Sequence, residues 1–320
     1  MQTPAQLQQI IEEAIPKIEY PKNPSNLYEP IRYIMSLGGK RIRPVMVLMA
    51  SELFTTEIYK ALDVALAIET FHNFTLVHDD IMDNAPLRRG KATVHEKWGV
   101  NNAILSGDVM MVESNKHLSK VDLLVLKPVL DTFNATAQGV CEGQQLDMEF
   151  EQRNDVSIEE YMEMIRLKTA VLLGGAIKLG AIVSGASTAD AELLYTFGEN
   201  LGLAFQLQDD ILDVYGDPEK FGKKVGGDII SNKKTFLHLK TLSLAQSDEI
   251  NSLTSITRDQ DLKIAEVTNL YNKYGIQELA TAEMEKYLAK ANHALESLAV
   301  VDEKKIQFRE LVQQIMERDR

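Results

Sequence analysis

The sequence predicts an all-α fold in a single domain, residues 1–320. Apolar residues recur at three- and four-residue spacings along almost the whole chain, which is the spacing of one helix face. No alternating polar and apolar run bounded by hairpin turns appears, and no motif repeats at a period typical of a solenoid. A chain of 320 residues can bury a substantial core, so we expect one bundle of about ten or more helices.

The first half of the chain predicts two early helices and a longer one. Leu-Gly-Gly at residues 37–39 ends a first helix, because glycine readily terminates helices, and Pro44 restarts the next. From Leu62 to Val77 the hydrophobic positions keep helical spacing, which predicts a long helix.

The second half continues in the same way. Ser157 and Glu160 form a capping box that opens a helix, and residues 190–215 predict another long one. The apolar stretch at residues 169–186 is nearly long enough to cross a membrane, but Lys178 and four glycines interrupt it. We therefore expect a buried, closely packed helix there and no integral membrane segment.

Composition narrows the class of protein. A net charge of −13 argues against a nucleic-acid partner, so local cations or metal must meet any anionic substrate. Cys141 is the single cysteine, which excludes an intramolecular disulfide. The N-terminus lacks the basic start and apolar core of a signal peptide, so a cytoplasmic protein is expected.

Two acidic clusters of one form, DDIMD at residues 79–83 and DDILD at residues 209–213, each close an apolar segment just before helix-stopping residues. Stacked carboxylates at i and i+4 destabilise a helix, and acidic residues at its C-terminus oppose the helix dipole. Both clusters combine these two destabilising features, which predicts a site for hard divalent cations. An all-oxygen ligand set favours Mg²⁺. The candidate ligands are Asp79, Asp80, Asp83, Asp209, Asp210 and Asp213. Two solvated helix ends, or a structural Ca²⁺ site, are the alternatives.

Basic residues that could bind phosphate accompany these clusters. Arg88 and Arg89 follow the first one, and GGKRIRP at residues 38–44 is a glycine-rich basic loop. Each could also be ordinary surface charge. Residues 216–234 follow the second cluster with four glycines and five lysines, which predicts a lid or else a solvated linker.

His72 lies three residues after Glu69, the spacing found in di-iron carboxylate bundles. Such a site needs the motif twice, and none of the other five histidines has glutamate at that spacing. The di-iron interpretation is therefore excluded, and a plain core histidine stays open.

Together, the motifs resemble those of the trans-polyprenyl diphosphate synthases of the farnesyl and geranylgeranyl type. They are GGKRIRP, HDDIMD, LRRG, the Gly-Asp pair at residues 107–108, EGQQLD, LKTA, FQLQDDILD and GKKVGGD. The resemblance covers residues 30–239, and the order and spacing of the motifs make it highly specific. It implies a large helical bundle of the isoprenoid synthase type with a central active-site cavity, and a prenyltransferase that condenses isopentenyl diphosphate with an allylic diphosphate.

The resemblance also implies a role for each matching position. The six aspartates would hold a trinuclear Mg²⁺ site around the allylic diphosphate. The residues that would grip that diphosphate are Arg88, Lys168 and Lys223, with Lys233 nearby. The pocket for isopentenyl diphosphate would consist of Lys40, Arg43, His72 and Arg89. Thr169 and Gln206 would face the developing carbocation, so the catalytic candidates are Lys168, Thr169, Gln206 and Lys223. A homodimer is implied as well.

The implied mechanism is ionisation followed by condensation. Mg²⁺ and cationic side chains would stabilise the departing pyrophosphate, the allylic C–O bond would ionise, and the isopentenyl double bond would attack the cation. Released pyrophosphate would take the proton, because the motifs contain no well-placed base. Aspartates acting directly as acid and base are the competing interpretation, which is weakened because metal would neutralise them.

Product length should depend on residues upstream of the first cluster. Phe74 lies five positions before Asp79, about 7.5 Å along a helix axis, Phe71 lies nearly one turn further on, and Thr75 is small. One aromatic floor at this depth resembles the short-chain synthases of the geranylgeranyl class, whereas a second aromatic residue at position 75 would resemble a farnesyl synthase of the animal type. DDIMD lacks the two extra residues of the usual bacterial farnesyl pattern. Both phenylalanines could instead be core residues.

Three other interpretations stay open or are disfavoured. A longer-chain synthase and a subunit of a heteromeric prenyl synthase are the alternatives, although such partner subunits lose the Asp clusters that this chain keeps. A terpene cyclase is disfavoured, because its second motif mixes Asn, Ser and Glu and it has no use for an isopentenyl pocket.

Overall fold

A computed structural model describes residues 1–217, 225–246, 249 and 259–316. In this part of the chain helices dominate and one short hairpin supplies the strands, which confirms the all-α prediction. The chain forms two compact units, each described by itself below. Unit 1 comprises Met1–Phe133, Ala176–Glu192 and Ala299–Gln307, and unit 2 comprises the other described residues. The single domain over residues 1–320 stays a prediction.

Unit 1 is built from the N-terminal helices and a few later segments. Its elements are α1 (Pro4–Ala14), η1 (Ile15–Lys17), α2 (Ser25–Ser36), α3 (Ile42–Phe54), η2 (Ile58–Ala61), α4 (Leu62–Met82), β1 (Leu87–Arg88), β2 (Lys91–Ala92), α5 (Val94–Trp98), α6 (Val100–Leu118), the start of α7 (Leu123–Gln152), the end of α9 (Val171–Val183), the start of α10 (Thr188–Tyr215) and η4 (Asp302–Lys304).

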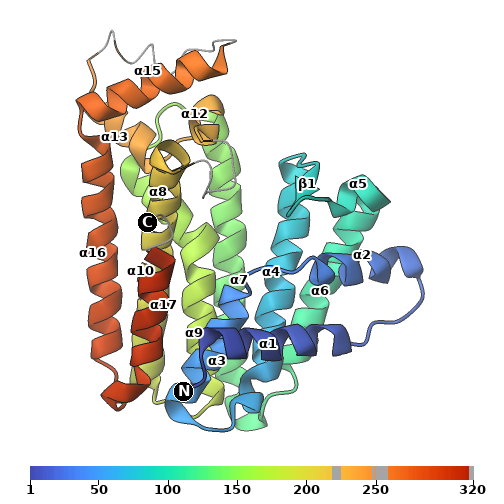
Figure 1. Cartoon of the computed structure of the whole chain (residues 1–320). Coiled ribbons are helices and arrows are strands. Elements are labelled where there is room, and N and C mark those ends of the chain that lie inside the picture. The colour runs from blue at the N-terminus through green and yellow to red at the C-terminus, as the bar shows by residue number, and fades with distance from the viewer. Residues whose placement is uncertain (218–224, 247–248, 250–258, 317–320) are drawn as a thin grey trace. The chain divides into compact units, whose positions relative to one another are not determined.

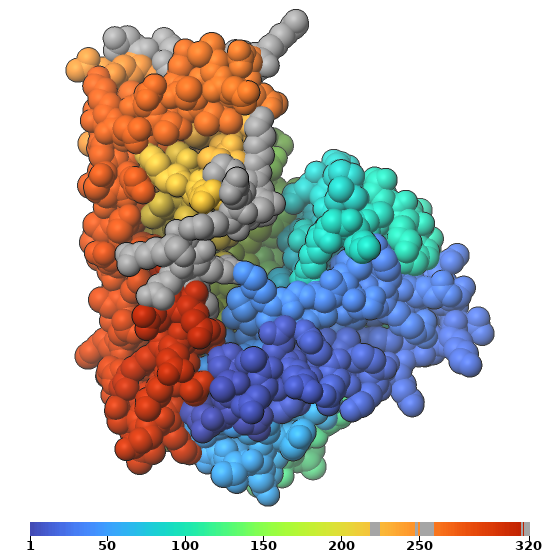
Figure 2. Space-filling view, viewed as in Figure 1, coloured from blue at the N-terminus to red at the C-terminus, as the bar shows by residue number. Residues whose placement is uncertain are grey.

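Helix α4 is the central helix of unit 1. Helix α6 packs along it, and α3 and α2 contact it as well (Figure 1). Every residue from Val64 to Phe71 is buried, as expected for a helix that is apolar on most sides. The predicted long helix is confirmed, and it extends to Met82, so that DDIMD occupies its last turn. Helix α1 packs against α3 and lies on the surface of the unit (dark blue in Figure 2).

The glycine-rich loop before α3 has an unusual backbone. Helix α2 ends at Ser36, which confirms the predicted stop, and α3 begins at Ile42, two residues before Pro44. Gly38 and Gly39 have φ of 72° and 140°, values that glycine adopts without strain. Arg41 has φ of 49° although it carries a side chain.

The hairpin after α4 was not predicted from the sequence. Leu87 pairs with Ala92 and Arg88 with Lys91 in antiparallel register. The two residues between the strands, Arg89 and Gly90, have φ of 53° and 72°, as a two-residue type I′ turn requires. Strands of two residues are too short to produce an alternating sequence pattern, which is why this element escaped prediction.

Unit 2 contains most of the C-terminal helices. Its elements are the rest of α7, α8 (Ile158–Ile165), a π-helical turn η3 (Arg166–Ala170), the start of α9, the rest of α10, α12 (Gly227–Ile230), α13 (Phe236–Leu244), α15 (Gln260–Lys273), α16 (Ile276–Glu296) and α17 (Ile306–Met316) from Phe308 onward. Helix α15 lies across the beginning of α16 (Figure 1). Side chains of α8, α10, α13, α15 and α16 share one apolar core that includes Tyr161, Leu207, Leu237 and Tyr271.

The helix that starts after Ser157 changes its winding partway along. The predicted capping box is present, because the Ser157 hydroxyl accepts from the Glu160 amide at 3.1 Å and the Glu160 carboxylate accepts from the Ser157 amide at 2.9 Å. After α8 the chain makes the π-helical turn, in which the amide of Val171 donates to the carbonyl of Arg166, five residues earlier. Turns of this kind are rare and often occur at functional sites.

Helix α9 is the buried, closely packed helix that the sequence predicts. Residues 170–177 and 179–181 are all buried. A Cβ atom at Gly180 would lie 2.2 Å from the carbonyl oxygen of Val47, so the backbones of α9 and α3 touch in unit 1. Across the described residues, no helix has both the length and the hydropathy that spanning a bilayer requires.

Candidate active site

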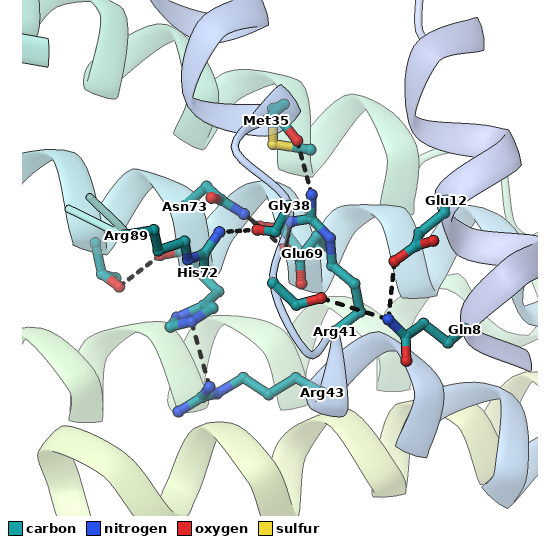
Figure 3. A network of polar contacts seen from close by, with 12 residues as sticks. Gln8, Glu12, Met35, Gly38, Arg41, Arg43, Glu69, His72, Asn73 and Arg89 are labelled. Atoms are coloured by element: carbon teal, nitrogen blue, oxygen red, sulfur yellow. Dashed lines mark hydrogen bonds and ion pairs between the residues drawn. The ribbon is translucent and has the colours of Figure 1, made fainter. Parts of the chain in front are cut away.

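A cluster of arginines in unit 1 surrounds His72 on α4 (Figure 3). Nη1 of Arg43, at the start of α3, donates to Nε2 of His72 at 3.3 Å. Arg89, in the hairpin turn, donates to the carbonyl of Gly38 in the loop before α3. These contacts bring together three of the four residues assigned to the isopentenyl pocket by resemblance, and the fourth, Lys40, lies exposed on the same loop.

The surroundings of His72 keep its imidazole neutral. Burial lowers the pKa of His72 well below the usual histidine range, and nearby positive charges lower that pKa further. These charges belong, in order of effect, to Arg43, Arg89, Arg88 and Arg41. A neutral imidazole can accept a hydrogen bond, so His72 acts as an acceptor for Arg43 and not as a further cation.

Positive charge exceeds negative charge around His72. Burial lowers the pKa of Arg43, and Glu69 partly offsets that effect. Burial likewise lowers the pKa of Arg89, the charge of Arg41 adds to the effect, and Glu69 again opposes it. Arginines that are held together at a cost, and that the carboxylates of Glu69 and Asp80 offset only in part, form a cluster that favours an anion.

Glycine is required where Arg89 meets the loop. A Cβ atom at Gly39 would lie 2.9 Å from Cζ of Arg89, so any side chain there would push the guanidinium away. The φ of 140° at Gly39 disfavours other residues for a second, independent reason.

The first acidic motif lies at the C-terminal turn of α4. The amide of Asp83 donates to the carbonyl of Asp79 at 2.8 Å, which places the two residues one turn apart on one side of the helix. Asp80 is fully buried and is held by Arg88, whose Nε lies 2.8 and 2.9 Å from its carboxylate oxygens. Asp79 is half-buried and Asp83 is exposed. Arg88 is assigned to the allylic diphosphate by resemblance, and it thus contacts a carboxylate of the first acidic motif.

A row of aromatic rings lies on α4 before this motif. Ring centroids are 4.8 Å apart for Phe74 and His78, 5.5 Å for Phe71 and Phe74, and 5.3 Å for Phe71 and Phe133. Phe71 and Phe133 are buried core residues, whereas Phe74 is half-buried. Thr75 donates its hydroxyl to a backbone carbonyl three residues earlier at 2.8 Å. Of the predicted chain-length residues, Phe74 is therefore the aromatic side chain that is not fully enclosed by core.

In unit 2, the second acidic motif of α10 is joined to α8 and η3 by polar contacts. The Tyr161 hydroxyl donates to Asp210, which is only 2% exposed. Gln206 lies 3.5 Å from the other carboxylate oxygen of Asp210, and the Thr169 hydroxyl lies 3.4 Å from the Gln206 amide oxygen. The predicted pair Thr169 and Gln206 is thus in contact, and Tyr161 is a partner that sequence analysis missed.

Burial raises the pKa of Asp210 to about 7. The Tyr161 hydrogen bond and the charge of Lys233 lower that pKa, while the charge of Asp228 raises it. When ionisation of a carboxylate is unfavourable, a nearby cation stabilises the ionised form most strongly.

Several acids surround Lys233 in this unit. Burial opposes its charge, but the carboxylates outweigh burial and raise the pKa of Lys233. They belong, in order of effect, to Asp228, Asp210, Asp147 and Asp213. The backbone amide of Asp228 donates to the Asp213 carboxylate at 2.9 Å, so α12 extends the acidic group beyond the predicted motif.

Lys168 and Thr169 lie on the π-helical turn, close against α7. Lys168 pairs with Asp147, the last residue of the EGQQLD motif. A Cβ atom at Gly143 would lie 2.2 Å from the backbone nitrogen of Lys168, so this glycine permits the close approach. The π turn could not be predicted from the sequence, although Gly143 and Asp147 were both visible within one motif.

The acidic residues fit Mg²⁺ that is shared with a phosphate ligand. Among the described residues, no three acidic, histidine or cysteine side chains converge to cage a metal by themselves. Mg²⁺ is usually bound by one or two carboxylates and completes its shell with phosphate oxygens and water. The acid-rich surroundings of Asp210 and Asp213 suit this mode. Lys223 and part of the predicted lid, residues 218–224, lie outside the described residues.

Known proteins are similar to this chain in sequence and in fold. Residues 24–274 match the family model "Polyprenyl synthetase". A short chain isoprenyl diphosphate synthase of Methanothermobacter thermautotrophicus is 41% identical over 281 residues, which are 87% of this chain and 86% of that protein. A geranylgeranyl diphosphate synthase of Methanosarcina mazei is 42% identical over 230 residues, 71% of either chain. A crystal structure of a geranylgeranyl pyrophosphate synthase has a TM-score of 0.94 at 42% identity, covering 100% of both chains.

The all-α architecture is that of the isoprenoid synthase fold. The chain belongs to the polyprenyl synthetase family and is a prenyltransferase. The family resemblance predicted from the motifs is therefore confirmed. Enzymes of this family are generally magnesium-dependent.

Gly143→Ala should disturb the π turn that carries Lys168 and Thr169. Because the added methyl would collide with backbone, which cannot rotate away, we expect turnover to fall about tenfold or more. Overpacking should lower the free energy of unfolding by about 1–3 kcal/mol. The control is Gly139→Ala, one turn earlier on α7, where a Cβ atom meets only Leu167 and Val171 side chains at 3.4 Å. Steady-state assays and urea unfolding of both variants test this, and near-normal turnover of Gly143→Ala would contradict it.

The depressed pKa of His72 predicts a dependence of stability on pH. Below about pH 6.5 the unfolded chain binds a proton at this residue and the folded protein does not. The free energy of unfolding should therefore fall with falling pH, by up to about 1.4 kcal/mol per pH unit from this group. Burial lowers the pKa of His238 to about 4, so His238 contributes in the same direction. Urea unfolding between about pH 5 and 7.5 should give a smaller slope for His72→Gln. An unchanged slope would show that His72 titrates normally.

Proposed function

We propose that this prenyltransferase condenses isopentenyl diphosphate with an allylic diphosphate and makes a short-chain product, geranylgeranyl diphosphate. The observation that carries the proposal is the arginine cluster around the neutral His72, which has the charge and donors to bind a diphosphate. Relatives that bear the name geranylgeranyl diphosphate synthase support the product.

The arginine cluster is proposed as the site for isopentenyl diphosphate. Arg43 and Arg89 present guanidinium groups, each of which can bind two phosphate oxygens, and Lys40 adds an exposed ammonium group on the loop before α3. His72 accepts from Arg43 and so orients that guanidinium. Binding the substrate anion would relieve the repulsion among the arginines.

The aspartates of both motifs are proposed to bind the allylic diphosphate through Mg²⁺. When bound, the metal stabilises the negative charge that develops on the leaving pyrophosphate. Arg88, Lys168, Lys223 and Lys233 are proposed to hold the same diphosphate. Thr169 and Gln206 supply oxygen dipoles for the allylic cation, and their mutual contact keeps both in one orientation.

Mass spectrometry of the products tests the proposed function. The purified chain should be incubated with Mg²⁺, isopentenyl diphosphate and, separately, dimethylallyl, geranyl or farnesyl diphosphate. A C20 product from each primer supports the proposal. A longer product would favour the alternative of a longer-chain synthase. Elongation that occurs only after a second protein is added would favour a subunit of a heteromeric synthase.

A homodimer in the cytoplasm is part of the same proposal. One side of α6 leaves large apolar side chains in solvent, at 41–55% exposure, and a second copy of the chain could cover them. These residues are Val100, Ile104, Leu105 and Val112. Light scattering of the purified chain measures the oligomeric state.

Removing either acidic motif should abolish catalysis without unfolding the protein. We expect Asp79→Ala and Asp209→Ala to lower turnover by about two orders of magnitude or more, because the leaving pyrophosphate would lose metal ligands. Circular dichroism should show unchanged helix content. Asp131→Ala, an exposed aspartate on α7, serves as the control and should keep normal turnover. Full activity in both motif variants would refute the metal assignment.

Phe74 should act as the floor for the growing chain. Phe74→Ala is expected to lengthen the product by one or more isoprene units, because the half-buried ring would no longer block the path. Thr75→Phe, which adds a second aromatic ring beside it, should shift the product towards C15. Chromatography of the dephosphorylated products measures both changes, and an unaltered length distribution in Phe74→Ala would remove Phe74 from this role.

A further inference from the structure

Arg41 lies beside Arg43 and His72, and its buried guanidinium is directed at Glu69 and Met35 (Figure 3). Its side chain is 3% exposed and its guanidinium pairs with the Glu69 carboxylate on α4, whose side chain is 2% exposed. A second guanidinium nitrogen donates to the carbonyl of Met35, at the end of α2, at 2.8 Å. Arg41 thus ties the loop before α3 to two helices.

Glu69 is itself held by Asn73, one turn further along α4. The Asn73 amide nitrogen donates to the Glu69 carboxylate and to the Glu69 carbonyl, both at 2.8 Å. Asn73 is fully buried. The carboxylate that receives Arg41 therefore has a fixed rotamer.

The same face of α4 also carries His72. Residues 69, 72 and 73 are spaced i, i+3 and i+4, so their side chains are neighbours on one side of the helix. Arg41 contacts Glu69, and Arg43, two residues later at the start of α3, contacts His72. The ion pair therefore fixes the position at which the basic loop lies on α4.

This arrangement is costly if stability is its only role. A left-handed backbone at a non-glycine residue costs about 1–2 kcal/mol, and glycine at position 41 would avoid it. A buried ion pair is often no more stabilising than two apolar side chains of similar size. Both costs are explained if the Arg41–Glu69 pair is needed to hold Lys40 and Arg43 in place.

We infer that Arg41, held by Glu69 and Asn73, is a positioning residue that fixes Lys40 and Arg43 for one diphosphate group. This inference rests on the proposed function, in which these residues bind isopentenyl diphosphate. Arg41 also pairs with the Glu69 carboxylate, which attracts Arg43 and Arg89. Without Arg41, that carboxylate would compete with the substrate for these two arginines.

Three variants separate positioning from simple stabilisation. Arg41→Met leaves Glu69 unpaired, Arg41→Lys keeps the charge but not the forked geometry, and Arg41→Met/Glu69→Gln removes both charges. We expect each to raise the KM for isopentenyl diphosphate, by about tenfold or more for Arg41→Met, and to change the KM for the allylic substrate less than about twofold. The double variant should regain stability in urea unfolding yet keep a raised KM, because no buried charge is left unpaired but the loop is no longer fixed.

The control is Lys178→Met/Glu192→Gln, which removes an ion pair of unit 1 that joins α9 to α10 at 2.6 Å. It should leave both KM values unchanged. A double variant at positions 41 and 69 with a normal KM for isopentenyl diphosphate would overturn the inference, as would equal changes for both substrates. If Arg41→Met does not fold, the other two variants still decide.

Calorimetry with inorganic pyrophosphate, without metal, separates failure of this inference from failure of the proposed function. A wild-type chain that binds pyrophosphate but does not elongate would contradict the proposed function alone. Weaker pyrophosphate binding by Arg41→Met/Glu69→Gln, about fivefold or more, would still support the positioning role. Equal binding by this variant and the wild-type chain would overturn it.

Discussion

Electrostatic repulsion is the constraint on which both sites of this protein depend. In unit 1 several arginines are held around one imidazole, and burial makes that imidazole reluctant to carry a charge of its own. In unit 2 several carboxylates are held around Lys233, and one of them is so enclosed that its ionised form is disfavoured. Groups of like charge stay together only where packed helices and specific hydrogen bonds oppose their separation. The stability of the folded protein thus maintains two regions of opposite electrostatic potential, each prepared for a ligand that relieves it.

Backbone geometry provides the close approaches that these regions need. The loop before α3 passes through glycines and a left-handed arginine to reach α4, and a π-helical turn brings Lys168 against a glycine of α7. Both features depart from regular helical structure at positions where side chains with a proposed role in substrate binding lie. Elsewhere the elements are regular, with capping boxes at Thr3 and Ser157 and continuous buried faces on α3 and α4.

Features with a periodic or local signal could be predicted from the sequence. The helices, the capping box at Ser157, the two acidic motifs and the family all followed from spacing and motif order. The Arg41–Glu69 pair, the Tyr161–Asp210 contact and the contact between Asp213 and the Asp228 amide were not predicted, because each joins residues that are distant along the chain. Glu69 is recognisable in the sequence as an acidic residue in an otherwise apolar helix. Its partner could not be predicted, because several cationic residues of the basic loop were equally suitable. The hairpin and the π turn were too short to leave any pattern.

The hairpin between α4 and α5 has a consequence for how the enzyme could be altered. Its two neighbouring arginines serve different structures: Arg88 grips an aspartate of α4, while Arg89 caps a carbonyl of the loop before α3. Because the turn has two residues, the two guanidinium groups cannot move independently. Lengthening or shortening this connection by a single residue would therefore move both guanidinium groups together, so redesign of one proposed phosphate site through this hairpin would necessarily alter the other.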